Sequence, residues 1–212
     1  MDKEQVKKAI TELKSQPERK FSQSYDLIIN LKNLVVKSSP VDLFVTLHYP
    51  KGKEVKIAGF VGNQLSEQSN KHFDLTISEA DFVKYADKKQ LKQLADSYDY
   101  FVAQANLMPK VAQAFGKVLG IKGKMPNPKL GCVVPPNANL GTLKNKLQKT
   151  VRLQAKKATN LQCLVGKQSQ PDAEIIDNVI TVYQAVLKAL PNEEQNIKNA
   201  QLKLTMSKPI KI

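Results

Sequence analysis

A segment rich in glycine, proline and lysine, LGIKGKMPNPKLG at residues 119–131, carries side chains that could bind an anion. Its three glycines and two prolines cannot continue a helix, so they predict a shaped loop. Lys122, Lys124 and Lys129 extend from this loop, and backbone N–H groups near glycines such as Gly123 can also bind phosphate oxygens. The residues alone leave an ordinary glycine-proline connection equally open.

The sequence contains no recognisable catalytic or metal-binding motif. His48 falls on the polar side of an expected strand and His72 beside the start of another, so both are interpreted as surface histidines. Cys132 and Cys163 lie in apolar runs and are expected to be buried, and their spacing to the histidines matches no structural zinc site. The segment FVGNQLSEQ at residues 60–68 lacks the glycine and lysine patterns of nucleotide-binding loops. We therefore expect no metal, no cofactor and no catalysis.

The charge of the chain indicates a polyanionic partner. The 33 basic residues outnumber the 19 acidic ones, giving a net charge of +14, and only Arg19 and Arg152 are arginine. Between Asp99 and Asp172 the chain has no acidic residue over 72 positions, where its average composition predicts between six and seven. Lysine contacts phosphate as a point charge, so this pattern favours recognition of a nucleic-acid backbone.

Two features argue against a membrane as that partner. No apolar run approaches the roughly 20 residues that span a bilayer, and no stretch combines a basic face with a large aromatic or leucine face. The N-terminal residues MDKEQVKKAITELK also lack the apolar core of a secretory signal. We expect a soluble intracellular protein.

The two ends of the chain have the hydrophobic periods of strands and single helices. Helical spacing predicts a helix over residues 2–15, and alternation predicts strands over 24–32 and 41–49. After residue 149 come the strand-like runs TVRLQAK and LQCLVGK, a helix beginning at Asp172, and a strand over 200–206. The residues assigned to the apolar face of that helix are Ile176, Val179, Ile180, Tyr183, Leu187 and Leu190.

The middle of the chain alternates strands with helices, which predicts a parallel, layered sheet. Strands are expected at 55–62, 73–77, 98–104 and 131–134. Between them fall a short helical stretch, a helix capped by Ser78 with Phe82, Tyr85, Leu91 and Leu94 along its stripe, a helix ending at Gly120, and one near 139–148.

These patterns predict an α/β and α+β protein of two domains. Residues 1–56 and 149–212 would form a discontinuous α+β domain, an antiparallel sheet with helices on one side. Residues 57–148 would form an inserted Rossmann-like α/β domain. Two adjacent crossings near residues 57 and 149 would make a natural hinge.

Five segments, in order, closely resemble the ribosomal L-one family, the protein of the mobile large-subunit stalk beside the tRNA exit site. The run GKMPNPK at 123–129 matches the loop signature of the family, which usually has Pro and Arg at positions 121 and 122. The other segments are RKFSQS (19–24), HYPKGK (48–53), LVGK (164–167) and LTMSKPIKI (204–212). The loop and the C-terminus look archaeal or eukaryotic rather than bacterial.

The resemblance implies an rRNA-binding surface on the discontinuous domain. Carried over residue by residue, the surface comprises Lys20, Phe21, Ser24, Lys167, Thr205, Met206, Ser207 and Lys208. Residue type alone would place Phe21 and Met206 in the core. In the family, glycine usually stands at position 207, and a hydroxyl residue often stands at position 41, where this chain has Val41. The inserted domain would add a secondary RNA contact through Lys122, Gly123, Lys124 and Lys129.

The resemblance further implies a function in translation. It predicts a non-enzymatic protein, monomeric within the cytoplasmic ribosome, that binds the rRNA stalk element of the large subunit. It also predicts a role in release of deacylated exit-site tRNA, and repression of its own mRNA through an element that mimics the rRNA site. The alternatives are a small α/β enzyme acting on a phosphorylated substrate, and a basic RNA-binding protein outside the ribosome.

Overall fold

The computed structural model describes residues 2–17, 19–35, 40–85, 87–156 and 158–212. The chain divides into two compact units, which we call unit 1 (Met1–Lys53 and Lys149–Ile212) and unit 2 (Glu54–Gln148). Unit 2 is thus inserted between the two segments of unit 1. The sequence predicts crossings near residues 57 and 149, and the boundaries between the units lie at 53/54 and 148/149.

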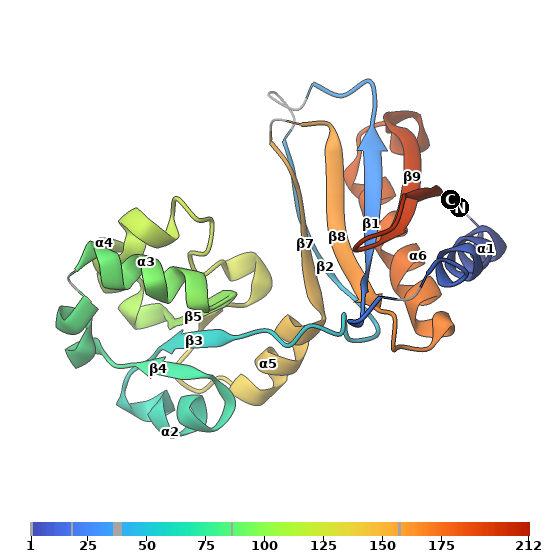
Figure 1. Ribbon diagram of the computed structural model, residues 1–212. Coiled ribbons are helices and arrows are strands. Elements are labelled where there is room, and N and C mark those ends of the chain that lie inside the picture. Colours follow the sequence, from blue (N-terminus) through green and yellow to red (C-terminus); the bar gives the residue numbers. More distant parts are fainter. Residues whose placement is uncertain (1, 18, 36–39, 86, 157) are drawn as a thin grey trace. The chain divides into compact units, whose positions relative to one another are not determined.

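All strand pairs of unit 1 are antiparallel (Figure 1). Four strands form one sheet in the order β10-β9-β1-β8, namely β1 (Ser24–Leu31), β8 (Asn160–Lys167), β9 (Ile197–Leu204) and β10 (Ile210–Lys211). Two more strands pair separately, β2 (Val41–Thr46) and β7 (Thr150–Ala155). The apolar pattern predicts a single sheet, which is wrong, and it gives no signal for the two-residue strand β10. It also extends the last strand to residue 206, whereas β9 ends at Leu204.

Two helices complete unit 1, and a short 3-10 turn, η4 (Glu193–Asn196), leads into β9. Helix α1 (Lys3–Lys14) buries the four apolar residues that its spacing predicted, Val6, Ala9, Ile10 and Leu13. For α6 (Asp172–Ala189) the predicted apolar face is correct only in part. Val179 and Leu190 are buried as predicted, but the other buried apolar residues are Ile175, Val182 and Val186. Ile176, Tyr183 and Leu187 pack at the edge of the same core. Since α6 is apolar on more than one side, periodicity could not decide which side the sheet covers.

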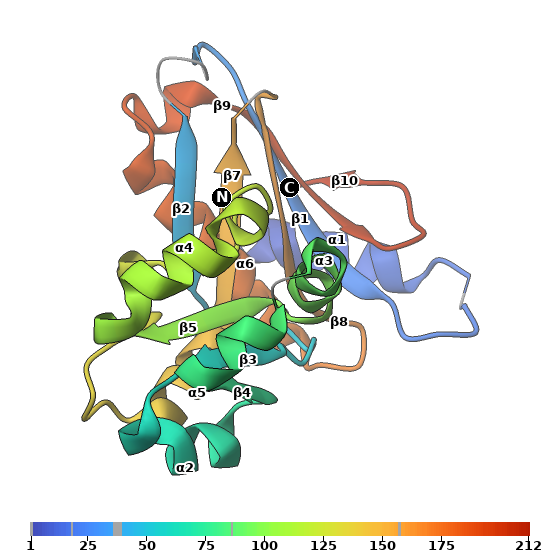
Figure 2. The same ribbon diagram turned by 90° about the vertical axis from the view of Figure 1, so that its left-hand side faces the viewer.

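Unit 2 is built on a parallel sheet in the order β4-β3-β5-β6. Its strands are β3 (Ile57–Phe60), β4 (Leu75–Ile77), β5 (Tyr100–Gln104) and β6 (Val133–Val134). Helices α3 (Lys88–Ser97) and α4 (Met108–Leu119) cover one face, while α2 (Asn63–His72) and α5 (Leu140–Lys149) lie on the other (Figures 1 and 2). Two further 3-10 turns are η2 (Ala105–Leu107) and η3 (Pro128–Leu130). The mixed α/β and α+β fold class is confirmed.

The helix expected from Ser78 is interrupted. A 3-10 segment, η1 (Glu79–Tyr85), comes first, and α3 then begins after Asp87, whose carboxylate accepts the N–H of Lys89 at 3.1 Å. Asp87 is therefore the N-cap of a second helix. The apolar stripe runs through both helical segments and so does not indicate where the second one begins. The stripe nevertheless enters the core, where the Phe82 ring lies 5.8 Å from that of Phe60.

Candidate nucleic-acid interface

Sheet register brings the separate segments of the expected RNA site together in unit 1. Strand β1 lies between β8 and β9, so Ser24 pairs with Lys167 and the neighbouring Tyr25 pairs with Leu204. Residues 20–24, 167 and 205–208 consequently meet at one end of the sheet. We call the eight predicted residues there the turn surface: Lys20, Phe21, Ser24, Lys167, Thr205, Met206, Ser207 and Lys208.

Two large apolar side chains of the turn surface are exposed. Phe21 is 52% exposed and Met206 is 60% exposed. The core placement that residue type alone suggested is therefore wrong for both. Exposed aromatic and thioether groups offer flat apolar contacts, which nucleic-acid-binding proteins use against bases and sugars.

Hydrogen bonds fix the backbone that carries Met206. The chain turns directly after β9, where the N–H of Ser207 donates to the Leu204 carbonyl at 3.1 Å. The Ser207 hydroxyl also accepts the N–H of Leu204 at 2.7 Å. The Thr205 hydroxyl accepts the N–H of Ser24 at 3.1 Å. The hydroxyls of Thr205 and Ser207 thus make hydrogen bonds that stabilise the turn. Met206 lies in this turn with its side chain exposed.

Gln23 is a central residue of this site that the sequence analysis did not select. Its side chain is only 4% exposed, and its Oε1 accepts the N–H of Met206 at 3.0 Å. Its backbone carbonyl accepts the N–H of Gln168 at 2.8 Å. A signal was available, because Gln23 continues the alternation of buried residues Tyr25 and Leu27 in β1. A polar residue in a core-facing register usually serves a specific hydrogen bond.

Two glycines leave room for side chains around Lys167. A Cβ on Gly166 would lie 2.1 Å from Cδ1 of the buried Ile175, so a larger residue there would displace that side chain. Gly52 has a positive φ of 77°, and its Cβ would lie 2.8 Å from Cγ of Lys167. Gln170 links the two segments, accepting the N–H of Lys167 at 2.7 Å and donating to the Pro50 carbonyl at 2.8 Å.

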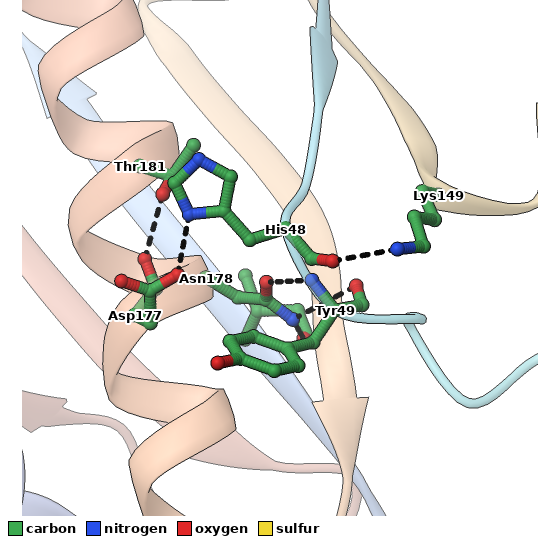
Figure 3. Close-up of polar contacts among 7 residues, drawn as sticks. His48, Tyr49, Lys149, Asp177, Asn178 and Thr181 are labelled. Carbon is green, nitrogen blue, oxygen red and sulfur yellow. Dashed lines mark hydrogen bonds and ion pairs between the residues drawn. The ribbon is translucent and has the colours of Figure 1, made fainter. Parts of the chain in front are cut away.

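A buried asparagine anchors the neighbouring chain segment to α6 (Figure 3). Asn178 has no exposed surface, and its Oδ1 accepts the N–H of Tyr49 while its Nδ2 donates to the carbonyls of Tyr49 and Val165. Beside it, Nδ1 of His48 lies 2.6 Å from a carboxylate oxygen of Asp177, and Lys149 donates to the His48 carbonyl at 2.8 Å. His48 is therefore held at the surface by a hydrogen bond to Asp177.

In unit 2 the segment at residues 119–131, which we call the lysine loop, is a shaped turn. Gly123 and Gly131 have positive φ values of 65° and 76°. The N–H of Lys124 donates to the Leu119 carbonyl, and Asn127 accepts the N–H of Lys129 at 2.9 Å. This geometry favours the shaped loop over an ordinary connection.

The three lysines of this loop differ in what their ammonium groups contact. Lys124 donates to the carbonyls of Ala95 and Tyr98, each at 2.7 Å, and so caps the C-terminal end of α3. Lys122 pairs with Asp96 and thereby lowers the pKa of that carboxyl. Lys129 is exposed. Two of the three lysines therefore hold the loop against α3.

The two cysteines are buried and unpaired with each other. Burial raises the pKa of the Cys132 thiol to about 11 and that of Cys163 to about 12, so both are neutral buried thiols, as expected. No group of three or more His, Cys, Asp or Glu side chains that could hold a metal occurs among the described residues. Within the same part of the chain, no helix is long and apolar enough to cross a membrane.

Comparison with known proteins identifies the family. The family model described as "Ribosomal protein L1p/L10e family" matches residues 12–208. The chain belongs to this family. It is 37% identical to the "Large ribosomal subunit protein uL1" of Nanoarchaeum equitans, over 99% of this chain and 98% of the relative. It is also 37% identical to the protein of that name from Methanothermococcus thermolithotrophicus, over 100% and 99% of the two chains.

The family assignment confirms three predictions. The resemblance to the L-one family, based on five short segments, is correct. These relatives come from archaea, which agrees with the archaeal or eukaryotic character of the loop and C-terminal sequences. Members of the L1p/L10e family are structural ribosomal proteins, so the prediction of a non-enzymatic protein is confirmed and the small α/β enzyme is set aside.

Proposed function

We propose that this protein is a structural component of the large subunit of the cytoplasmic ribosome and binds large-subunit rRNA at the mobile stalk through the turn surface. The observation that carries the proposal is the exposure of Phe21 and Met206 on a backbone fixed by the buried Gln23. Exposed apolar groups on a rigid turn suit the shape-based recognition of folded RNA.

The charges around these two side chains support the same partner. Lys20 and Lys208 are exposed and Lys167 is half-buried at the edge of the surface. Lysines placed around an apolar centre can contact phosphates. The hydroxyls of Ser24, Thr205 and Ser207 lie on the same surface, where they can hydrogen-bond a ribose 2′-OH. The lysine loop of unit 2, through Lys129, would supply the secondary contact.

The connection between the two units allows movement, and the turn surface allows regulation. Unit 2 is connected to unit 1 by two crossings only, at residues 53/54 and 148/149. Two adjacent crossings permit a hinge motion of the stalk during release of deacylated tRNA from the exit site. The same turn surface would bind an element of the protein's own mRNA that resembles the rRNA site, and so repress its translation.

Binding of the full-length protein to its own large-subunit stalk rRNA fragment, against an unrelated duplex over a salt series, tests the proposal. We expect discrimination by several orders of magnitude that persists near physiological salt. Equal and steeply salt-dependent binding to both RNAs would reduce the turn surface to a nonspecific cationic patch. Competition by the 5′ region of the protein's own mRNA in the same assay tests the regulatory part.

A further inference from the structure

Unit 2 contains a groove of about 710 Å³ between α3 and α4. Leu91 from α3 and Val118 from α4 line it and are almost fully buried. Ala114, Gly116 and Ile121 continue the apolar lining along α4 and past its C-terminal end. The groove lies within unit 2 and shares no residue with the turn surface.

The lining is apolar yet open to solvent. Ile121 is 90% exposed, the largest exposed fraction among the large apolar side chains that the structure describes. A Cβ on Gly116 would meet no atom within 4 Å, so free space lies directly over the backbone of α4. An isoleucine held at the end of such a groove is an exposed apolar anchor that no described residue of the chain covers.

The rim of the groove is positive. Lys88 and Lys117 line it, and neither makes an ion pair with any residue that the structure describes. Their neighbours differ, since Lys84 pairs with Asp81, Lys110 with Glu79 and Lys122 with Asp96. Helix α4 and the following loop contain no acidic residue at all. An occupant with negative flanks would therefore be favoured by charge.

We propose that this groove binds an amphipathic helix of a partner protein, one whose apolar face enters the groove and whose flanks are acidic. A helix laid between two helices buries its apolar stripe and sets its flanking residues over the rim. The small residues Ala114 and Gly116 let its side chains approach the α4 backbone. RNA fits less well, because the described lining includes no aromatic ring and no guanidinium group for base stacking.

The probe is a labelled helical peptide of about 18 residues, with leucines at i, i+3, i+4 and i+7 and glutamates on its other faces. Binding to the full-length protein is followed by fluorescence anisotropy. One control peptide has the same composition in scrambled order, and another replaces every glutamate by lysine. We expect binding of the first peptide only, weakening as salt rises.

Groove variants locate the binding. Ile121→Ser removes the exposed apolar side chain and leaves the core unchanged. The double variant Lys88→Glu/Lys117→Glu reverses the charge of the rim. Each should weaken binding of the acidic peptide about tenfold. The double variant Lys188→Glu/Lys198→Glu, which alters exposed lysines of unit 1, should leave it unchanged.

Three results would overturn the proposal. The first is no binding of the acidic peptide, or equal binding of the scrambled one. The second is equal affinity of the parent and both groove variants. The third is a loss of affinity for stalk rRNA or tRNA in the groove variants without any effect on the peptide, which would make the groove an RNA contact. None of these results bears on the turn surface, so this inference and the proposed function can fail separately.

Discussion

The turn surface of unit 1 and the lysine loop of unit 2 are both basic, but their side chains are engaged differently. On the turn surface, Lys20 and Lys208 are exposed beside two exposed apolar groups. In the lysine loop, Lys124 caps α3 and Lys122 pairs with Asp96. Density of lysine in the sequence therefore does not measure the positive charge that is available to a ligand, because backbone carbonyls and carboxylates of the protein compete for it.

The scaffold behind the turn surface should be the most sensitive part of unit 1. Asn178→Ala leaves the N–H and carbonyl of Tyr49 and the carbonyl of Val165 without their partner, so we expect unit 1 to lose about 3 kcal/mol of unfolding free energy. Hydrogen exchange resolved by residue measures this, and Gln184→Ala on the exposed side of α6 is the control. Equal protection in both variants would show that the asparagine is dispensable.

The exposed apolar pair tests the turn surface directly. Phe21→Ala or Met206→Ala should each reduce affinity for stalk rRNA by roughly 1–3 kcal/mol with no change in folding, because both side chains lie largely outside the core. Ile121→Ala, an equally drastic change at an exposed apolar residue of unit 2, should reduce that affinity far less, because the lysine loop supplies only a secondary contact. Parent-like binding by both unit 1 variants would remove the site from this surface.

Lys124 and Lys129 should separate structural from ligand-binding lysines within one loop. Lys124→Ala removes the donor to two carbonyls at the end of α3 and should cost unit 2 about 1–2 kcal/mol of stability, with the salt dependence of RNA binding unchanged. Lys129→Ala should leave stability unchanged and reduce the salt slope by roughly one. Chemical denaturation measures the first effect and a salt titration of rRNA binding measures the second. A stability loss in Lys129→Ala together with a reduced salt slope in Lys124→Ala would contradict these assignments.

Gln23 sharpens the description of the turn surface. Gln23→Leu removes the acceptor for the N–H of Met206, and we expect a loss of about 1 kcal/mol in RNA affinity. Gln23→Glu keeps a side-chain oxygen at that position and should recover most of it. A merely structural role would instead lower stability in both variants and leave RNA affinity unchanged in the folded fraction.

Acid titration gives the smallest expected difference. The Arg152 guanidinium donates to both carboxylate oxygens of Asp42, at 2.9 and 2.7 Å, and holds the pKa of that carboxyl below its usual value. A carboxyl group with a lowered pKa in the folded state stabilises the fold at pH values above its unfolded-state pKa. This stability is lost as the pH falls through the folded-state pKa. Asp42→Asn should therefore lower the stability of unit 1 by less than about 1 kcal/mol at neutral pH and converge with the parent in acid. Urea midpoints across pH check this.

The pattern of apolar residues was enough to predict most elements and both sheet types. Helix α1, the alternation in β1 and the parallel sheet of unit 2 follow from period and local chemistry. Short motifs were enough for the family, since five matched segments lie in order along the chain. Both kinds of signal are local, so a single sequence carries them.

Tertiary contacts determine which side chains are exposed and which lysines are already paired within the protein. Phe21 and Met206 are apolar by type, yet both are exposed. Met206 lies in a turn that Gln23 and Thr205 link to the start of β1, far away in the sequence. The buried face of α6 depended on where the sheet covers it, and the role of Lys124 depended on the end of α3 lying within reach. Most elements and the family can be predicted from sequence alone, because those depend on neighbouring residues. The surface available to RNA was decided by contacts between residues that only folding brings together.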